Sequence, residues 1–392
     1  MKPQTSPPSG CPALATFLFG KGGPLFDSQP PHPTNAGLCS RHALPDNSAI
    51  KAKPPFRKGR VGRRPQSLET DAHLGRIVRV LTSYPTLVIS GTKLAQEIGT
   101  TRSEVWRLVQ QLRTLGVEIA GHPASGYQLT AVPDLLLPEL LDPMLRGTIF
   151  AGHVHHYYRA GSTNTLAIEA AASGAPEGSV FLAEQQTGGR GRGNHKWHSA
   201  ESTGIYGSVV LRPTLPPSDV LVLSLASGLA VHAAVSGMSP GIPPELKWPN
   251  DLLIAGKKFC GILTEMSAEA TRVRHIVVGI GINVNQTQFP DELQPIATSL
   301  QLATGKEWSR IELCAALLKS LDREYRAVLG NPDAHAYILR RFEENSPMAR
   351  GCHVHVEENG GFEGMTEGLD PRGFLKVLTT EGVRIVYSGT VR

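Results

Sequence analysis

From Gln185 to Trp197 the chain reads QQTGGRGRGNHKW, the most unusual stretch in its 392 residues. Four of the six residues 188–193 are glycines, which give a pliable backbone whose amides can close around an anion. Arg190 and Arg192 alternate with these glycines, so their guanidinium groups can hold phosphate or carboxylate oxygens. The pattern is neither a P-loop nor a dinucleotide-binding GxGxxG that opens a helix. We interpret it as an anion-binding loop; the alternative is a flexible basic loop without a ligand.

Three further motifs lie on either side of this loop. Residues 161–164 read GSTN and offer hydroxyl and amide groups at a predicted helix start, where they could also form an ordinary N-cap. Residues 246–252 read LKWPNDL, so Lys247 ends a predicted strand and can bind a carboxylate and the phosphate that activates it. Residues 278–285 read VGIGINVN: the glycines let a strand approach a ligand and Asn283 offers an amide, although a tight sheet crossing gives the same pattern.

Strands and helices alternate around these motifs, which predicts a mixed α/β domain over residues 145–346. Strands are predicted at 178–184, 204–211 and 275–284, with a hairpin at 252–263 that turns at Ala255-Gly256. Residues 220–235 are apolar and uncharged. They are fewer than the roughly 20 residues needed to span a bilayer. We therefore expect a buried core helix and no membrane partner.

Residues 67–132 have the pattern of a winged helix-turn-helix. Apolar residues recur at helical spacing from Leu74 to Leu81, and a shorter stripe from Leu94 to Ile98 stops at Gly99. Two short predicted strands, 117–120 and 127–129, flank a Gly/Pro turn that would form the wing.

The helix after Gly99 is the candidate recognition helix. Thr101 stands three residues before Glu104, which predicts a capping box with two reciprocal hydrogen bonds. The helix would bury an apolar face and lay the opposite face in the DNA major groove. The net charge of this unit is only about +1, so a protein-binding winged helix is the alternative. The candidate DNA-binding residues are Arg102, Ser103, Trp106, Arg107 and Gln110.

The two ends of the chain differ from its body. Residues 1–66 hold 12 of the 30 prolines and ten basic against two acidic residues, so the net charge of +5 comes from this segment. We expect this segment to be a disordered extension. Its basic residues 51–64 could bind DNA phosphates. The alternative is a solvated tail, or a start codon placed too far upstream. Residues 347–392 show short predicted strands between Gly-rich turns, which is typical of a small β-barrel.

Composition excludes several classes of protein. Apolar residues make up 40% and charged residues 19%, which describes a globular chain with a sizeable core. The five cysteines lie far apart and form no CxxC, so we expect no disulfide framework, no metal site by side-chain motif, and a reducing cytoplasm. The chain start lacks a continuous apolar segment of the kind that a secretory signal needs.

Together the four motifs resemble those of the bacterial biotin–protein ligases, in the bifunctional form that carries a biotin-operon repressor domain. The resemblance runs from about residue 70 to the C-terminus, in the family order. It implies an α+β protein with an N-terminal winged helix-turn-helix, a central mixed α/β ligase domain like that of class II synthetases, and a C-terminal SH3-like β-barrel.

The resemblance also implies an activity. Such an enzyme joins biotin to ATP with Mg²⁺, which gives biotinyl-5′-adenylate, and passes biotin to a carrier lysine on the biotin carboxyl carrier of acetyl-CoA carboxylase. The family's repressors bind operator DNA and dimerise through the central sheet. A Gly-rich loop that is disordered until it folds over the adenylate would exclude water from the anhydride.

By matching positions, Lys247 and Arg192 are the implied catalytic residues. The backbone of Gly261 and Leu263 would read the ureido ring of biotin, and Asn283 completes the candidate set. The other implied contacts to biotin or the adenylate are Ser162, Thr163, Asn164, Gln186, Arg190 and Gly191.

The sequence departs from the family pattern at three places. Asn194 and His195 stand where the family loop has Gly and Arg, and no aromatic residue lies near Ile296 in the expected adenine-binding loop, residues 286–300. These departures motivate a second hypothesis, a biotin-sensing DNA-binding regulator with weak or no ligase activity. A third is a relative that attaches lipoate or octanoate, because those transferases share this general fold.

Overall fold

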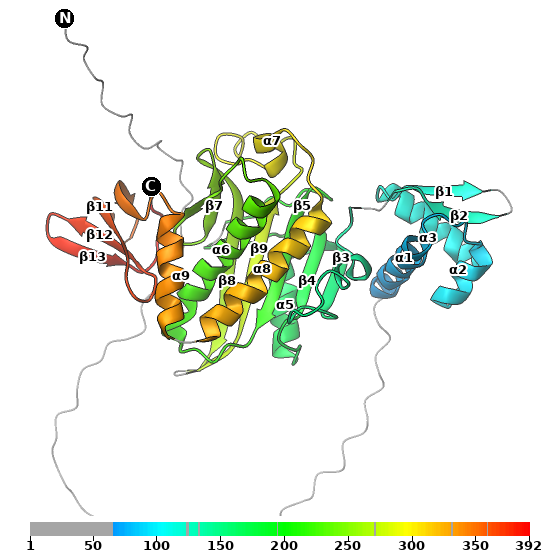
Figure 1. Ribbon diagram of the computed structural model, residues 1–392, viewed down its shortest axis with the longest axis horizontal. Helices are drawn as coiled ribbons and strands as arrows, with labels where there is room; N and C mark the ends of the chain where they lie inside the picture. Colours follow the sequence, from blue (N-terminus) through cyan, green and yellow to red (C-terminus); the bar gives the residue numbers. More distant parts are fainter. Residues whose placement is uncertain are drawn as a thin grey trace, which may run out of the picture.

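The computed structural model describes residues 66–392, apart from 123–124, 132–133, 194, 270–271, 331 and 359. The predicted extension, with its basic residues 51–64, lies outside the described part except for Gln66. Three units follow one another along the long axis of the molecule (Figure 1). They are a small helical unit, a central sheet covered by helices, and a small sheet that contains most of the C-terminal 45 residues of the chain.

The N-terminal unit has the predicted winged helix-turn-helix form. Its helices pack around one apolar cluster, with Leu74, Leu94 and Leu108 fully buried. Gly99 ends the second helix in the left-handed region, at a φ of 73°, which a glycine adopts without strain. Its elements are α1 (Gln66–Ser83), α2 (Gly91–Ile98), α3 (Arg102–Thr114) and a wing made of β1 (Ile119–His122) and β2 (Gly126–Leu129).

The cap of α3 forms only half of the predicted box. The hydroxyl of Thr101 accepts from the Glu104 amide at 3.2 Å, as expected. Both carboxylate oxygens of Glu104 accept instead from Arg107, at 2.9 and 2.6 Å. An i,i+3 arginine on the same helix face offers this carboxylate a charged partner, which accounts for the missing reciprocal bond.

The central unit is built on a seven-stranded sheet with the order β3-β4-β5-β9-β8-β7-β6. β3 and β4 are parallel, and every other neighbouring pair is antiparallel. The strands are β3 (Val154–Ala160), β4 (Val180–Gln186), β5 (Gly204–Leu211), β6 (Glu245–Lys247), β7 (Asp251–Ile254), β8 (Lys257–Ala268) and β9 (Val273–Asn283). The predicted strands and hairpin are thus present.

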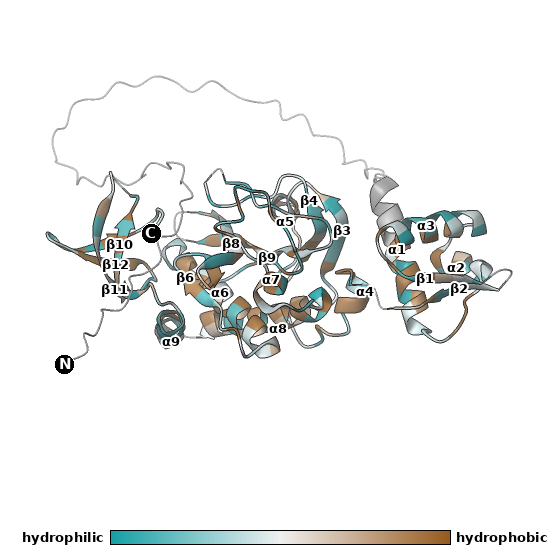
Figure 2. Ribbon diagram, turned by 90° about the horizontal axis from the view of Figure 1, so that it is seen from above, coloured by the Kyte–Doolittle hydropathy of each residue, from teal (hydrophilic) through white to brown (hydrophobic). Residues whose placement is uncertain are grey.

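Helices cover both faces of this sheet. Phe181 and Val210 pack with α5 on one face, whereas the next residues along, Leu182 and Leu211, join the main core with α6 and α8 on the other. The predicted apolar helix is α6 (Figure 2). By length and composition the stretch Pro217–Met238 could cross a membrane, but 72% of its most apolar 18-residue window is buried within the protein, as in a core helix. The helices are α4 (Pro138–Leu141), α5 (Thr163–Ala172), η1 (Pro217–Asp219), α6 (Val220–Met238), α7 (Leu300–Thr304), α8 (Arg310–Gly330) and α9 (Pro332–Glu344).

The C-terminal unit is a four-stranded antiparallel sheet that shares its core with the central unit. Val354 and Val377 belong to the same apolar cluster as α6. The indole nitrogen of Trp248, the tryptophan of the sequence KWPND at 247–251, donates to the Gly373 carbonyl at 2.9 Å and joins the two units. The strands are β10 (Arg350–Val356), β11 (Phe362–Leu369), β12 (Leu375–Thr379) and β13 (Gly382–Val386).

Buried charges fix the linker between the first two units. Arg310, at 1% exposure, pairs with Asp134 of the linker at 2.8 Å and with Glu184 of β4 at 2.7 Å. Glu184 also accepts from the Leu136 amide at 2.8 Å. Burial alone would raise the pKa of Glu184, but the hydrogen bond from His156 and the charge of Arg310 outweigh it and lower this pKa to about 2.

Candidate active site

Two adjoining cavities lie between the start of α5, the loop after β4 and the β7–β8 hairpin. The smaller encloses about 470 Å³ and the larger about 1140 Å³. Most of the residues expected in the site line the smaller cavity, and Lys247 and Asn283 line the larger one. Those at the smaller cavity are Ser162, Thr163, Asn164, Gln186, Arg190, Gly191, Arg192, Gly261 and Leu263.

The GSTN motif is more than an N-cap. Ser162 is the N-cap residue of α5, but its side chain makes no capping hydrogen bond. The Thr163 amide donates to Gln186 Oε1 at 2.9 Å, and Asn164 Nδ2 donates to the Leu263 carbonyl at 3.2 Å. Ser208 of β5 lies 2.5 Å from Asn164 Oδ1 and completes this buried network. The network holds the polar floor of the smaller cavity across three strands.

The glycines of β9 line the smaller cavity, and they also leave room for side chains of the protein itself. A Cβ on Gly279 would collide with the amide of Asn164, and one on Gly281 would lie 2.6 Å from the indole of Trp197. Trp197 therefore packs against the strand at Gly281, and its Nε1 is buried with no hydrogen-bond partner among the described residues.

The Gly-rich loop folds as a short hairpin. The Gly191 amide donates to the His195 carbonyl at 2.8 Å, and the Trp197 amide donates to the Gly189 carbonyl at 2.9 Å. A Cβ on Gly189 would lie 2.5 Å from the Trp197 carbonyl, so glycine is required there by close approach. Asn194, one of the departures from the family pattern, lies outside the described residues.

The two arginines of the loop have different surroundings. Arg190 is exposed and pairs with Glu265 of β8 at 2.6 Å. Arg192 is more buried and donates to Asn250 Oδ1 at 3.1 Å. Burial lowers the pKa of Arg192, and the charge of Asp251 acts in the opposite direction. Arg192 lines both cavities, so it can reach ligands in either.

Lys247 ends β6, as predicted, at the larger cavity. Burial lowers the pKa of its ammonium, Asp251 raises it, and Lys258 and Arg392 lower it further. The bond between Trp248 and Pro249 is cis. Lys247 pairs with Asp251 across β6 and β7, and in the turn between them Asn250 Nδ2 donates to the Ile262 carbonyl at 3.0 Å. These backbone and side-chain bonds position the lysine.

The larger cavity has an aromatic wall that our sequence reasoning missed. Phe289 is 8% exposed, lies in the loop 286–300 and lines this cavity with Leu293 and Ile296. Its ring centroid lies 6.5 Å from that of His198. No aromatic residue is close to Ile296 along the chain, as expected. The loop nevertheless folds so that Phe289 and Ile296 line the same cavity.

Asn283 supports this loop as well as lining the cavity. Its Nδ2 donates to the Thr298 carbonyl at 3.0 Å, and its Oδ1 accepts from Gln286 at 3.4 Å. The amide that we expected to meet a ligand is therefore used within the protein. Lys258, which lines both cavities, was not predicted. Neither were Ser208 and Glu265, which hold the lining side chains of Asn164 and Arg190.

The candidate DNA face lies on α3. Arg102, Ser103 and Arg107 are exposed, Gln110 is half-buried, and Trp106 is 58% exposed, which is unusual for so large an apolar side chain. The ion pair with Glu104 occupies Arg107, so the free cation of this face among the predicted residues is Arg102.

The junction of the two cavities is suited to two anionic groups that lie side by side. It joins a small polar cavity to a larger, partly aromatic one, and cationic side chains line the junction. No group of three or more His, Cys, Asp or Glu side chains in the described part of the chain could hold a metal ion. Such an arrangement can align two negatively charged reactants and stabilise charge that develops between them.

Three family models match the chain. The Biotin/lipoate A/B protein ligase family covers residues 157–283, an HTH domain covers 74–128, and the Biotin protein ligase C terminal domain covers 351–391. The three matches fall on the central, N-terminal and C-terminal units respectively.

Individual relatives agree with these matches. The bifunctional ligase/repressor BirA of Bacillus subtilis is 36% identical over 307 residues, which cover 77% of this chain and 93% of that protein. The corresponding Escherichia coli protein is 28% identical and covers 75% of this chain and 89% of its own length. A biotin protein ligase from Aquifex aeolicus, solved with biotin and ATP, has a TM-score of 0.54 at 31% identity, covering 62% of this chain and 99% of that one. The chain therefore belongs to the biotin protein ligase family, in the form that joins a ligase to an N-terminal helix-turn-helix domain.

Proposed function

We propose that this protein is an ATP-dependent biotin–protein ligase that also acts as a biotin-responsive repressor. The observation that carries the ligase proposal is the junction of the two cavities, where Arg192 lies between the polar pocket and the cavity lined by Lys247. Biotin would occupy the smaller cavity and the nucleotide the larger one. Its domains would span residues 67–132, 145–346 and 347–392.

The first step needs no nucleophile from the protein. A carboxylate oxygen of biotin attacks the α-phosphorus of ATP, the bond from this phosphorus to the oxygen bridging to the β-phosphate breaks, and pyrophosphate leaves with the electron pair. Arg192 and Lys247 would hold the carboxylate and the phosphate together and stabilise the charge on the phosphoryl oxygens. Mg²⁺ bound to ATP would neutralise part of the charge of the triphosphate.

In the second step the acceptor completes the reaction. The ε-amine of a carrier lysine attacks the acyl carbon of biotinyl-5′-adenylate, the acyl–oxygen bond breaks, AMP leaves and the amine loses a proton. The hairpin of residues 188–197 would cover the adenylate and slow its hydrolysis. We propose the biotin carboxyl carrier protein of acetyl-CoA carboxylase as the acceptor and the cytoplasm as the compartment.

Phe289 would take the place of the missing aromatic in the nucleotide site. Its ring lines the larger cavity, where a nucleobase can stack on it between Leu293 and Ile296. Phe289→Leu keeps the volume nearly constant, and we expect it to raise the KM for ATP with little change in the affinity for biotin.

One assay separates the ligase from the alternatives. Purified protein is incubated with biotin, ATP·Mg²⁺ and an apo carrier domain, and biotin on the carrier is detected with streptavidin. We expect labelling that requires ATP and is lost when the acceptor lysine of the carrier is replaced by arginine. Labelling that fails with biotin, but succeeds when lipoate or octanoate is supplied and detected by mass spectrometry, would overturn the proposal. Failure with every acid would favour the biotin-sensing regulator.

The repressor proposal rests on α3. Its exposed face carries Arg102, Ser103 and Trp106 in the geometry that a recognition helix needs. We propose that the adenylate promotes dimerisation and binding to operator DNA. A gel shift on the DNA upstream of biotin-synthesis genes should appear with biotin and ATP, and a protein that shows no shift in either condition would have a structural helix-turn-helix only.

A further inference from the structure

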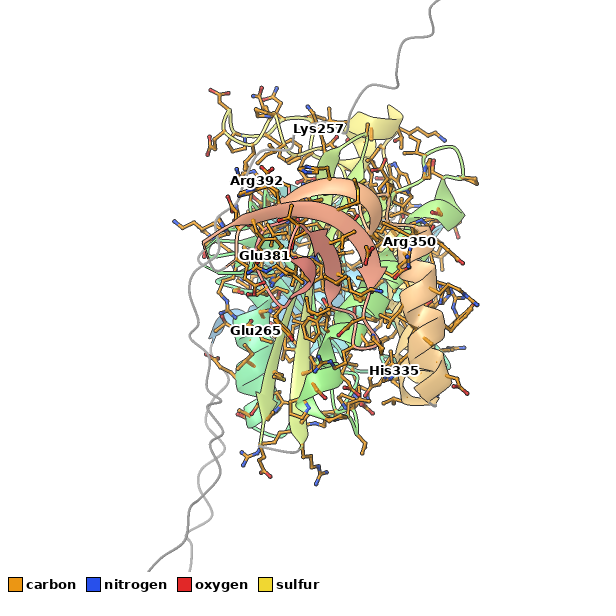
Figure 3. All side chains as sticks on the ribbon, turned by 90° about the vertical axis from the view of Figure 1, so that its left-hand side faces the viewer. Lys257, Glu265, His335, Arg350, Glu381 and Arg392 are labelled. Atoms are coloured by element: carbon orange, nitrogen blue, oxygen red, sulfur yellow. The ribbon has the colours of Figure 1, made fainter. Side chains whose placement is uncertain are left out.

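We propose that Glu265 is a positioning residue, one that ties the Gly-rich segment 188–193 to the floor of the smaller cavity and so keeps biotinyl-5′-adenylate bound until the acceptor arrives. The inference rests on the proposed adenylation reaction and deepens it. Glu265 lies on β8, lines neither cavity and is labelled in Figure 3. It acts through its neighbours and does not touch the ligand.

The register of β8 places Glu265 beside the smaller cavity. Leu263, two residues earlier, lines that cavity, and alternate residues of a strand face the same side of a sheet. Leu263 pairs with Gly279 of β9, and Glu265 pairs with Val277, which packs with α5. The carboxylate therefore lies one step beyond the cavity wall, on the face of the sheet that α5 covers.

The first contact of Glu265 is with the floor of the smaller cavity. Asn164 Nδ2 donates to Glu265 Oε2 at 2.9 Å and to the Leu263 carbonyl at 3.2 Å. These two acceptors use both hydrogens of the amide, and Asn164 Oδ1 accepts from Ser208 at 2.5 Å. Glu265 therefore helps to fix which way the amide of Asn164 faces, and with it the polar floor.

The second contact is with the base of the Gly-rich hairpin. Arg190 Nη2 donates to the same Oε2 at 2.6 Å, in an ion pair whose side chains are 41% and 30% exposed. Arg190 also forms an antiparallel bridge with Lys196 on the returning side of the hairpin. Trp197 packs against the strand at Gly281. Glu265 thus provides a charged anchor for the hairpin, and Trp197 provides an apolar one.

A single carboxylate oxygen therefore serves the floor and the Gly-rich segment together. A ligand in the smaller cavity touches both parts, and it can leave when the segment moves away from β8. A partly exposed ion pair is weak enough to break and form again, so the segment can open to admit a ligand. A hydrogen bond to a charged group is stronger than one to a neutral group, so the charge of Glu265 favours the closed position.

This role concerns retention of the intermediate more than its formation. Glu265 forms no covalent bond to a substrate and exchanges no proton. Adenylate formation depends on the cations at the junction of the cavities, so its rate should change less than the rate of release. When the pair with Arg190 is lost, the adenylate should escape more often and acylate amines in solution.

The test separates the charge of Glu265 from its geometry in the full-length protein. Glu265→Gln keeps an oxygen that can accept from Asn164 but removes the charge that holds Arg190. Glu265→Met removes both. Glu269→Gln is the matched control, since Glu269 pairs with Arg274 at 2.8 Å in a more exposed ion pair and lies outside both cavities.

Four quantities are measured for each protein. The enzyme is loaded with radiolabelled biotin and ATP·Mg²⁺, and the adenylate that dissociates is counted after rapid filtration. Biotin affinity is measured by calorimetry, adenylate formation by biotin-dependent ATP–pyrophosphate exchange, and the melting temperature by scanning calorimetry.

We expect Glu265→Gln to release the adenylate about three- to fivefold faster than wild type, the scale of a partly exposed ion pair, with biotin affinity within twofold. Glu265→Met should release it at least as fast. It should also bind biotin about fivefold more weakly or worse, because the amide of Asn164 loses a charged acceptor. Glu269→Gln should match wild type in all four measurements.

A double variant shows whether the effect runs through Arg190. Arg190→Met should release the adenylate about as fast as Glu265→Gln, and the combined variant should be no faster, since both changes remove the same pair. Release from Glu265→Gln at the wild-type rate, or effects of the two changes that add, would overturn the inference. So would a fall in exchange, biotin affinity and melting temperature together in Glu265→Gln, which would indicate a merely structural role. Wild-type protein without exchange would instead count against the proposed ligase function itself.

Discussion

The chemistry of the site depends on where a few cations lie. Lys247 is held at the end of β6 in a partly buried place, and burial is the main cause of its lowered pKa. A lysine with a lowered pKa loses its charge at a lower pH than an exposed one. As the pH rises, the free enzyme should therefore lose its affinity for the triphosphate at a lower pH than it would if Lys247 had the pKa of an exposed lysine.

This argument predicts the behaviour of two variants. Lys247→Ala should lower biotin-dependent exchange by at least about 100-fold, since it removes a charge aimed at the phosphate. Lys247→Arg should keep a small activity whose kcat/KM stays flat through the alkaline range, because guanidinium remains protonated. The pH profile of kcat/KM checks both. An alkaline fall at the same pH in wild type and Lys247→Arg would assign the titration to another group.

The sequence predicted those site residues whose neighbours along the chain are unusual. Arg192 stands among glycines and Lys247 stands before Trp-Pro, and a residue with a purely structural role rarely has such neighbours. Ser208 and Lys258 stand in ordinary strand sequence. Their places at the site follow from strand pairing, which includes an irregularity between β7 and β8 beside Lys258. Phe289 was missed because contacts in a folded loop do not follow distance along the chain.

The elements around the site are held by buried charges as well as by apolar packing. α8 begins at Arg310, whose guanidinium pairs with Glu184 at the middle of β4 and with Asp134 of the linker. β4 ends at Gln186, which accepts from α5 and leads into the Gly-rich loop. The position of the loop thus depends on a pair of charges on its far side.

Arg310→Met should destabilise the protein strongly. Removing one partner of a buried ion pair leaves an uncompensated charge and typically costs about 3–5 kcal/mol. Arg326→Met on the same helix is the matched control, because its pair with Asp322 is solvent-exposed on the arginine side. Urea unfolding followed by circular dichroism compares the two. Equal midpoints for both variants would show that the buried pair is not structurally important.

The exposed face of α3 leads us to expect that DNA binding can be lost while the stability of the fold is kept. Trp106 is the largest exposed apolar side chain on α3 and can contact thymine methyl groups in the major groove. Trp106→Ala should weaken operator binding by about tenfold or more without lowering the melting temperature, as measured by fluorescence anisotropy and calorimetry. Thr114→Ala, at the exposed end of the same helix, is the control and should bind like wild type. Unchanged affinity in Trp106→Ala would place the DNA contact elsewhere.

The three units of the molecule are joined more closely than the sequence indicated. Leu135 and Leu137 pack in the core of the N-terminal unit, and Leu136 between them packs in the core of the central unit. The segment between the two units also contains the short helix α4. What sequence could not provide is the contact between Asp134 and Arg310, which lie 176 residues apart.

Two truncations test this joint. A chain that begins at Asp134 keeps the partner of Arg310 and the buried Leu136, and one that begins at Pro138 lacks both. We expect the longer chain to melt several degrees higher by scanning calorimetry, and to keep more exchange activity, because β4 retains its support. Identical melting temperatures would mean that the linker contributes nothing to the ligase unit.

The central claim for the whole molecule is that the biotin carboxylate attacks the α-phosphate of ATP where the two cavities meet. Biotin labelled with ¹⁸O in both carboxylate oxygens follows this bond directly. The protein is given labelled biotin, ATP·Mg²⁺ and the apo carrier domain, and the AMP released is analysed by mass spectrometry. One ¹⁸O atom in the phosphate of AMP, matched by one biotin per carrier, is the predicted result. AMP without label, or label in inorganic phosphate with ADP as the nucleotide product, would contradict it.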